Sequence, residues 1–367
     1  MSSSTSSSNR HDARHFVVRL TIFSLTLIPL YAVAYLLSVS GKFDGTYITT
    51  QSYKLAQMRG PINYDVIIMG DSCAMAIDPT DPETLHQLQG QTIYNFGLVN
   101  LGGMYPVYST LKKYMDAGKS PKMILLSFLP SLLTRQPDIF DGSKFTKFYA
   151  AKFYTLHELL GDGEIRSHPG ALTHLLAEKF KLRFIQDRYD IPFNQKMFER
   201  VKAKSGQMLI LEDTRATEGE VQSAPQFRSE FQPSAQAMNY LSKFLQLAET
   251  HGAQVIIFMM PEPPTAYQAR LASGYFSNYF EALHELALQH PNLSIIERPF
   301  SLPNECFSTD VTHLNREGVE RYQKELWPVV LERARTLLAE RDRKAPKKTD
   351  DALAETSKDS LHSGAVP

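Results

Sequence analysis

The chain has few cysteines and no excess of charge of either sign. Its 367 residues include only two cysteines, Cys73 and Cys306, and its 39 Lys and Arg balance 39 Asp and Glu. A formal net charge of zero gives no indication of a nucleic-acid-binding surface. Two cysteines allow at most one internal disulfide, which would need an oxidising compartment and Cα atoms within about 7 Å. The alternative is that both are small buried thiols that fill space.

The sequence also lacks the patterns that bind common cofactors. It contains no glycine-rich phosphate loop and no dinucleotide-binding fingerprint, so a nucleotide cofactor is not indicated. Several histidines have no acidic or cysteine partner at a spacing typical of zinc sites, namely His157, His168, His174 and His251. The sequence therefore predicts neither a cofactor nor a bound metal.

Both ends of the chain differ from the middle in composition. Residues 1–19 are rich in serine and end in a region with three arginines, and residues 20–39 carry no charge. Twenty helical residues rise about 30 Å, enough to cross the hydrocarbon core, so we expect an uncleaved transmembrane anchor at 20–39. The arginines predict a cytoplasmic tail at 1–19 and an extracytoplasmic position for the rest. Residues 341–367 are polar and charged and are expected to be disordered.

Between the two ends, short apolar runs alternate with stretches of helical pattern. The 43% hydrophobic content is ample for a core. Such alternation predicts an α/β domain at about 60–340, a parallel sheet in a three-layer, flavodoxin-like sandwich. The expected strands are 64–69, 92–96, 123–128, 254–260 and 293–297, and the expected helices are 103–117, 234–250, 265–288 and 315–340.

One connection is far longer than the others. Residues 130–233 join the third and fourth expected strands, where a crossover needs only about a dozen residues. We therefore expect an inserted helical subdomain, with helices at 146–160 and 168–189. Its mixed charges fit an ordinary solvated surface. The alternative is a lid or docking platform near the site, in which Lys179, Lys181 and Arg183 meet an anionic polymer or lipid headgroups.

Two short motifs at opposite ends of the domain carry residues suited to nucleophilic catalysis. Gly70-Asp71-Ser72 directly follows the first expected strand, so Ser72 is presented at the carboxyl edge of the sheet, at the start of the expected following helix. Asp310 precedes His313 by three residues on a late loop and could orient it as the general base for Ser72. The alternatives are a helix-capping serine and a structural histidine. Asp71 is expected to stabilise the turn rather than act in catalysis.

These motifs resemble those of the SGNH or GDSL hydrolases, in particular the envelope acyltransferases that include DltD-like and alginate O-acetylation proteins. The matching blocks are Gly70-Asp71-Ser72, Asn95-Phe96-Gly97 and Asp310 to Asn315, in the family's order. The resemblance spans about residues 64–327, apart from the insertion. It implies the SGNH hydrolase fold, with catalytic Ser72, Asp310 and His313.

The resemblance is incomplete at the oxyanion hole. It implies backbone donors at Ser72 and Gly97, with Gly102 and Gly103 as alternatives to Gly97. The family's Gly-x-Asn-Asp block is replaced here by Ser127-Phe128-Leu129-Pro130, which contains no asparagine. We expect Asn100, in the loop after the second strand, to take the place of the missing amide.

The resemblance further implies an activity, a location and a partner. We expect a single-pass protein of the inner, cytoplasmic membrane, its catalytic domain in the periplasm. Through a serine acyl-enzyme it transfers an acetyl or alanyl group to hydroxyls of an envelope polysaccharide or related polymer. The partner implied by the family is a membrane-bound O-acyltransferase that brings the acyl group across the bilayer. The sequence leaves open a periplasmic serine esterase or lipase, in which water is the acceptor, and a noncatalytic envelope-assembly protein.

Overall fold

The computed structural model describes residues 7–39, 46–98, 103–134, 155–161, 163–167, 169–180, 194–222 and 230–344. The strands are β1 (Val66–Gly70), β2 (Ile93–Asn95), β3 (Met123–Ser127), β4 (Gln254–Phe258) and β5 (Leu293–Ile295). The helices are α1 (Ser7–Val39), α2 (Thr46–Arg59), α3 (Pro82–Gln87), α4 (Met104–Asp116), α6 (Leu156–Gly161), α7 (Gly163–Arg166), α8 (Pro169–Phe180), α9 (Gln195–Ala203), α10 (Glu218–Gln222), α11 (Ala235–Thr250), α12 (Pro264–Ala272), α13 (Tyr275–Gln289), α14 (Arg316–Glu325) and α15 (Trp327–Lys344), with short 3-10 turns at Ala74–Ala76, Pro130–Leu132 and Asn304–Cys306.

The five strands form one parallel sheet in the order β2-β1-β3-β4-β5. This is the strand order of flavodoxin-like doubly wound sheets, in which ligands bind at the carboxyl edge beside the switch in strand order. Here the switch lies between β1 and β3, which pair in register from Val66 opposite Met123 to Gly70 opposite Ser127. The predicted parallel α/β sheet is confirmed, and all five predicted strands are present.

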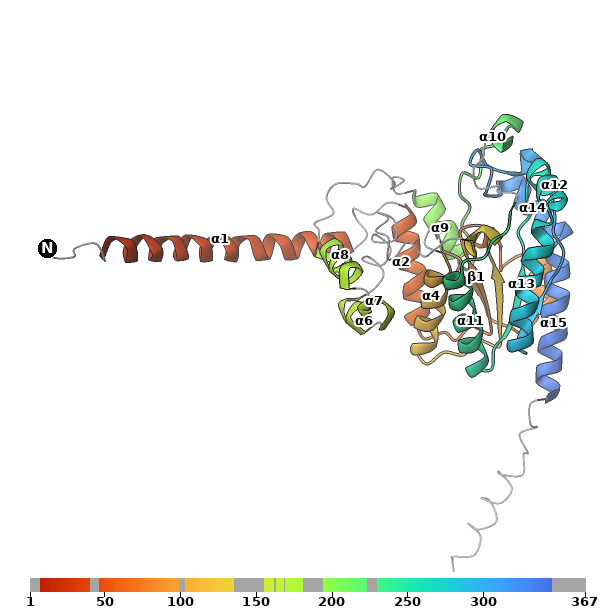
Figure 1. Ribbon diagram of the computed structural model, residues 1–367, viewed down its shortest axis with the longest axis horizontal. Coiled ribbons are helices and arrows are strands. Elements are labelled where there is room, and N and C mark those ends of the chain that lie inside the picture. Colours follow the sequence, from red (N-terminus) through yellow and green to blue (C-terminus); the bar gives the residue numbers. More distant parts are fainter. Residues whose placement is uncertain are drawn as a thin grey trace, which may run out of the picture.

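Helices cover both faces of the sheet (Figure 1). Alternate strand residues such as Ile67 and Met69 pack with α4, α11 and α13 on one face. Their neighbours Val66 and Ile68 belong to the cluster formed with α14 and α15 on the other face. Because successive side chains of a strand point to opposite faces, each strand contributes to both cores. This explains why the strands are continuous apolar runs in the sequence.

Two segments predicted as single helices, the second with a kink at Pro328, are each divided in two. The expected helix 265–288 ends at Ser273, and Gly274, with φ 75°, adopts the left-handed conformation before α13 begins. The expected helix 315–340 is broken between α14 and α15. Pro328 has no N–H to continue the helical hydrogen bonds of α14, but it is tolerated in the first turn of a new helix. Helix α15 runs on to Lys344, so residues 341–344 are helical, and the rest of the expected tail lies outside the described residues.

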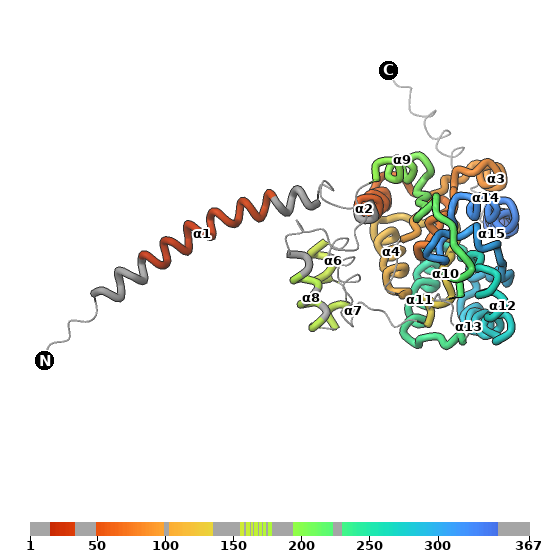
Figure 2. Tube along the Cα trace, turned by 90° about the horizontal axis from the view of Figure 1, so that it is seen from above, coloured from red at the N-terminus to blue at the C-terminus, as the bar shows by residue number. Residues whose placement is uncertain are grey.

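The insertion contains helices, as predicted, but only part of it is described. Helix α6 lies at the carboxyl end of the first expected helix, and α8 covers the amino-terminal half of the second. Residues 146–154 and 181–189, which include Lys181 and Arg183, lie outside the described residues. Helices α9 and α10 in the insertion, and α2 before β1, were not predicted. Helix α2 packs on the α/β domain beside α9 (Figure 2).

The amino-terminal helix α1 extends away from the α/β domain (Figures 1 and 2). Its segment His15–Val33 has a mean hydropathy of 1.9 and none of it is buried within the protein. A helix of this length and composition is long and apolar enough to cross a membrane. The helix is longer than the expected 20–39 span because it begins at Ser7 and includes most of the expected polar tail.

Candidate active site

The turn after β1 presents Ser72 at the carboxyl edge of the sheet. Gly70 has φ 143°, and a Cβ atom there would lie 1.6 Å from the carbonyl oxygen of Ser127 on β3. Only glycine allows the two strand ends to approach so closely. The chain can therefore turn at once, which leaves Ser72 partly exposed between two buried neighbours, Asp71 and Cys73.

No long helix begins at Ser72, so the prediction that this residue starts a helix is wrong. The turn is followed by a single 3-10 turn, Ala74–Ala76, and the next α-helix begins only at Pro82. The sequence explains this, because Pro79 and Pro82 restrict the residues that precede them to extended conformations. A helix started at Ser72 would have to end before Asp78.

Asp310 and His313 lie on a tight loop that the Asp310 carboxylate organises. Its Oδ1 accepts hydrogen bonds from the backbone N–H groups of Thr312 at 3.1 Å and His313 at 3.0 Å, and from the Ser308 hydroxyl at 2.8 Å. Val311, inside the loop, has φ 56°, a left-handed conformation that is rare for a β-branched residue. The carboxylate thus holds the backbone in the shape that faces the imidazole toward Ser72.

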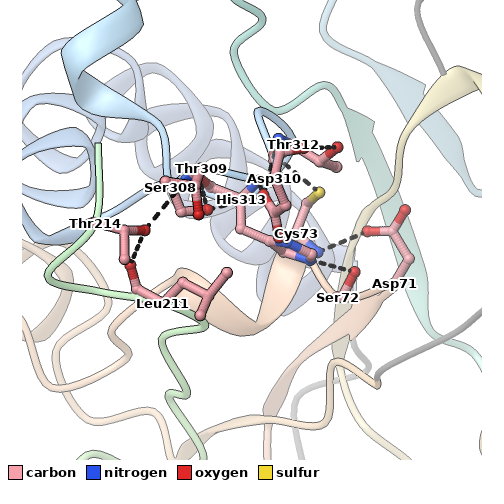
Figure 3. A network of polar contacts seen from close by, with 10 residues as sticks. All are labelled: Asp71, Ser72, Cys73, Leu211, Thr214, Ser308, Thr309, Asp310, Thr312 and His313. Carbon is pink, nitrogen blue, oxygen red and sulfur yellow. Dashed lines mark hydrogen bonds and ion pairs between the residues drawn. The ribbon is translucent and has the colours of Figure 1, made fainter. Parts of the chain in front are cut away.

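The loop and the turn, 241 residues apart in sequence, meet in a serine–histidine–aspartate arrangement (Figure 3). His313 Nε2 lies 2.7 Å from Ser72 Oγ, and His313 Nδ1 lies 2.6 Å from Asp310 Oδ2. Burial by itself would raise the pKa of Asp310, but the hydrogen bonds from His313 and Ser308 hold that pKa well below its usual range. A permanent carboxylate at Nδ1 fixes the tautomer in which Nε2 accepts the serine proton.

Asp71 has the structural role expected of it. Its Oδ1 accepts the N–H of Cys73 at 2.9 Å, and its Oδ2 accepts the N–H of Leu129 at 2.9 Å. Leu129 lies in the loop after β3, where the family that the sequence resembles carries an asparagine. Asp71 holds that loop against the turn that carries Ser72.

The two cysteines are free thiols and both are buried. Burial, followed by the nearby carboxylates of Asp71 and Asp310, raises the pKa of Cys73 well above its ordinary value. Burial raises the pKa of Cys306 to about 11. Because the thiolate is the reactive form, Cys73 is a poor nucleophile despite its position beside Ser72. The pair does not form the disulfide considered from the sequence.

The oxyanion hole departs from expectation at Gly97. Within the described residues, the N–H of Ser72 donates to no other protein group. The N–H of Gly97, in contrast, donates to Asn95 Oδ1 at 2.8 Å, and its carbonyl accepts a bond from Lys54 Nζ at 2.8 Å. The Gly97 N–H is therefore already used, which corrects its expected role as the second donor. Asn100 and Gly102 lie outside the described residues, and Gly103 is the residue that precedes α4.

Asn95 supports the site in a way that the sequence did not reveal. Its fully buried amide donates to the carbonyls of Ala74 and Ile77, both at 2.8 Å, as well as accepting from Gly97. Asn95 stands in one of the three matching blocks, but no role of its own is predicted for it from the sequence. It fixes the 3-10 turn behind Ser72.

Two comparisons with known proteins identify no relative of this chain. A scan against protein-family models finds no match, and a search of curated proteins finds no significant match.

Among the described residues, no three His, Cys, Asp or Glu side chains are grouped so that they could hold a metal ion. The function is therefore argued from the site itself.

Proposed function

We propose that this protein is a membrane-anchored serine acyltransferase that acts outside the cytoplasm on a cell-envelope polymer. The observation that carries the proposal is the pair of short contacts that join Ser72, His313 and Asp310. A serine hydroxyl that meets a histidine–aspartate pair from a distant part of the chain, in this order, is arranged as in enzymes that activate a serine nucleophile. The triad, the sheet-edge position and the three sequence blocks together support an SGNH-type site.

In the proposed reaction Ser72 Oγ attacks the carbonyl carbon of an acyl donor while its proton passes to His313 Nε2. The imidazolium is stabilised by the Asp310 carboxylate, and the N–H of Ser72 is directed at the developing oxyanion. His313 then gives the proton to the leaving group, and the acyl-enzyme remains. An acceptor hydroxyl gives its proton to His313 Nε2 and attacks the ester carbonyl. The bond to Ser72 Oγ then breaks, His313 returns the proton to that oxygen, and the acylated acceptor leaves.

The location and partners in this proposal derive from α1 and from the family resemblance. The helix is long enough to span a bilayer, and the arginines in its amino-terminal part, Arg10, Arg14 and Arg19, favour an amino terminus in the cytoplasm. A tether of this kind keeps the site close to the membrane surface. There a polytopic O-acyltransferase would supply acetyl or alanyl groups, and an envelope polysaccharide would accept them.

A serine-reactive fluorophosphonate tests the chemistry. We expect the full-length protein in detergent to be labelled, the Ser72→Ala variant to be unlabelled, and the His313→Gln variant to be labelled at least about 10³-fold more slowly. Ser277→Ala, which removes an exposed hydroxyl on α13, is the matched control and should label as the wild type does. Absence of labelling in the wild type would favour a noncatalytic assembly role, with which the occupied Gly97 N–H is compatible.

A second measurement separates transfer from hydrolysis. Cells that carry Ser72→Ala should lose ester-linked acyl groups from a surface polymer, because no acyl-enzyme forms. Unchanged polymer esters together with lost hydrolysis of small esters would instead identify an esterase, in which water takes the place of the acceptor hydroxyl.

A further inference from the structure

The last part of the insertion returns to the site and contacts both the turn that carries Ser72 and the loop that carries Asp310 and His313. We call residues 205–216 the strap. At its first end, the Ser205 carbonyl accepts the N–H of Asn95 at 2.8 Å, and the N–H of Met208 donates to the Met75 carbonyl at 2.8 Å. The buried Gln207 side chain donates to the carbonyl of Ala76 at 2.8 Å. These bonds hold the strap to the turn that carries Ser72.

Gly206 makes this close approach possible. Its φ is 95°, and a Cβ atom there would lie 2.2 Å from the carbonyl oxygen of Asn95. A side chain would force the strap away from β2. The chain between α9 and α10 then crosses the site end of the molecule (Figure 2).

The second end of the strap holds the loop that carries Asp310 and His313. The hydroxyl of Thr214 accepts the N–H of Thr309 at 3.1 Å and donates to the Leu211 carbonyl at 2.8 Å (Figure 3). The N–H of Ala216 donates to the Phe307 carbonyl at 2.9 Å. Thr309 immediately precedes Asp310, so the Thr214 hydroxyl acts one residue away from the carboxylate.

The local backbone shows why a hydroxyl is needed at this position. Leu211 has φ 52°, a left-handed conformation that costs free energy for a residue with a Cβ atom. The Thr214 N–H and hydroxyl both donate to the Leu211 carbonyl and so close this turn. The same hydroxyl accepts the N–H of Thr309, so the position of this turn helps to fix the position of Thr309.

We infer that the strap sets the distance between Ser72 and His313, and that Thr214 is a positioning residue for the catalytic loop. An effect of the strap on the reaction rate of Ser72 rests on the proposed function. An effect of the strap on the order of the loop that carries Asp310 and His313 does not. The strap reaches both halves of the site within twelve residues, so a shift at either end is transmitted to the Ser72–His313 contact. A misplacement of about 1 Å in such a contact costs up to about 100-fold in rate.

The test compares Thr214→Val, which keeps the shape and removes the hydroxyl, with Thr214→Ser, which keeps the hydroxyl. The matched control is Thr217→Val, which removes a hydroxyl bonded to Glu220 rather than to the catalytic loop. Hydrogen exchange of full-length protein in detergent reports loop order through the N–H groups of Thr312 and His313. Fluorophosphonate labelling of the same samples reports the chemistry, and their Tm values report overall folding. Thr214→Ala gives the same test if valine is not tolerated.

We expect Thr214→Val to speed exchange in the 307–315 peptide and to slow labelling about 10- to 100-fold with little change in Tm. Thr214→Ser and Thr217→Val should match the wild type in both measurements. Unchanged exchange and labelling in Thr214→Val, with a labelled wild type, would overturn the role of the strap and leave the proposed function standing. Faster exchange in Thr214→Val with no labelling of the wild type would support the strap and reject the catalytic proposal.

Discussion

The two carboxylate oxygens of Asp310 have different hydrogen-bond partners. Oδ1 accepts hydrogen bonds from the Ser308 hydroxyl and two backbone N–H groups, and Oδ2 accepts a hydrogen bond from His313 Nδ1. One side chain therefore shapes the loop and orients the imidazole of His313. Removing its charge should affect stability and chemistry together, although through different atoms.

We predict that Asp310→Asn lowers the fluorophosphonate labelling rate about 10³- to 10⁴-fold, because an amide that presents its N–H₂ to His313 favours the wrong tautomer. The folded-state pKa of Asp310 is depressed, so its carboxylate stabilises the fold above the unfolded pKa of about 3.9, and this contribution is lost as the pH falls through the folded pKa. The Tm difference between wild type and Asp310→Asn should be constant above about pH 5 and should shrink in stronger acid. Asp116→Asn, on the exposed end of α4, is the control.

A Tm difference that grew on acidification would contradict the depressed pKa. An unchanged labelling rate in Asp310→Asn would remove Asp310 from the mechanism while leaving its structural contacts intact.

The parts of the site that could be predicted are those encoded by local spacing. Gly70-Asp71-Ser72 and the Asp310–His313 interval each fix a short backbone shape, and the strand before Ser72 is a clear apolar run. The bond from the Gly97 N–H to Asn95 Oδ1 is local, because it joins residues only two positions apart. The other end of the Asn95 amide donates to the carbonyls of Ala74 and Ile77 in the turn after β1. Those two contacts are tertiary, and no spacing in the sequence reveals them.

At the scale of elements, α2 shows why a helix can escape prediction. Three of its polar residues, Thr50, Gln51 and Lys54, are fully buried, so its buried face does not have an apolar pattern. The Gln51 side chain contacts Met75, in the 3-10 turn that follows Ser72. The Thr50 side chain contacts Met208 of the strap. The Lys54 ammonium donates to the Gly97 carbonyl. Helix α2, which follows the membrane-length helix α1 in the chain, is thereby packed on both the strap and the turn.

Lys54 gives a pH-dependent test of this packing. Burial lowers its pKa from 10.5 to about 7, and no carboxylate in the described part of the chain pairs with it. Below pH 7 the lysine is charged in both folded and unfolded chains, and the buried charge is a constant cost. Between pH 7 and 10.5 only the unfolded chain holds the proton, so stability should rise with pH.

We predict that Lys54→Met removes this rise, which amounts to at most about 1.4 kcal/mol per pH unit. The free energy of unfolding of wild type and variant is measured from pH 6 to 9 in detergent. Lys112→Met, which removes an exposed lysine on α4, should retain the wild-type slope. A wild type and a Lys54→Met variant with parallel profiles would mean that Lys54 titrates normally in the folded protein.

At the scale of the whole molecule, the parallel sheet followed from the sequence because its strands are buried on both faces and read as continuous apolar runs. The course of the insertion did not follow. Its return along the strap is held in part by backbone groups, such as the carbonyl of Ser205 and the N–H of Met208. Because nearly every residue carries the same backbone groups, these contacts give no signal in the sequence. Gln207 and Thr214 also hold the strap, but their partners Ala76 and Thr309 are distant in sequence.

The proposed membrane topology can be tested with cysteine substitutions because the native thiols give little background. Cys73 and Cys306 are buried and their pKa values are raised, so both react slowly with a maleimide. In spheroplasts of a bacterial host, a membrane-impermeant maleimide should label Leu288→Cys, a site 88% exposed on α13, and should spare Ser4→Cys until the membrane is lysed. Labelling of Ser4→Cys alone would place the triad in the cytoplasm, where it could not reach an envelope polymer. Labelling of the unsubstituted protein would show that the thiols are more accessible than the packing of the nucleophile turn allows.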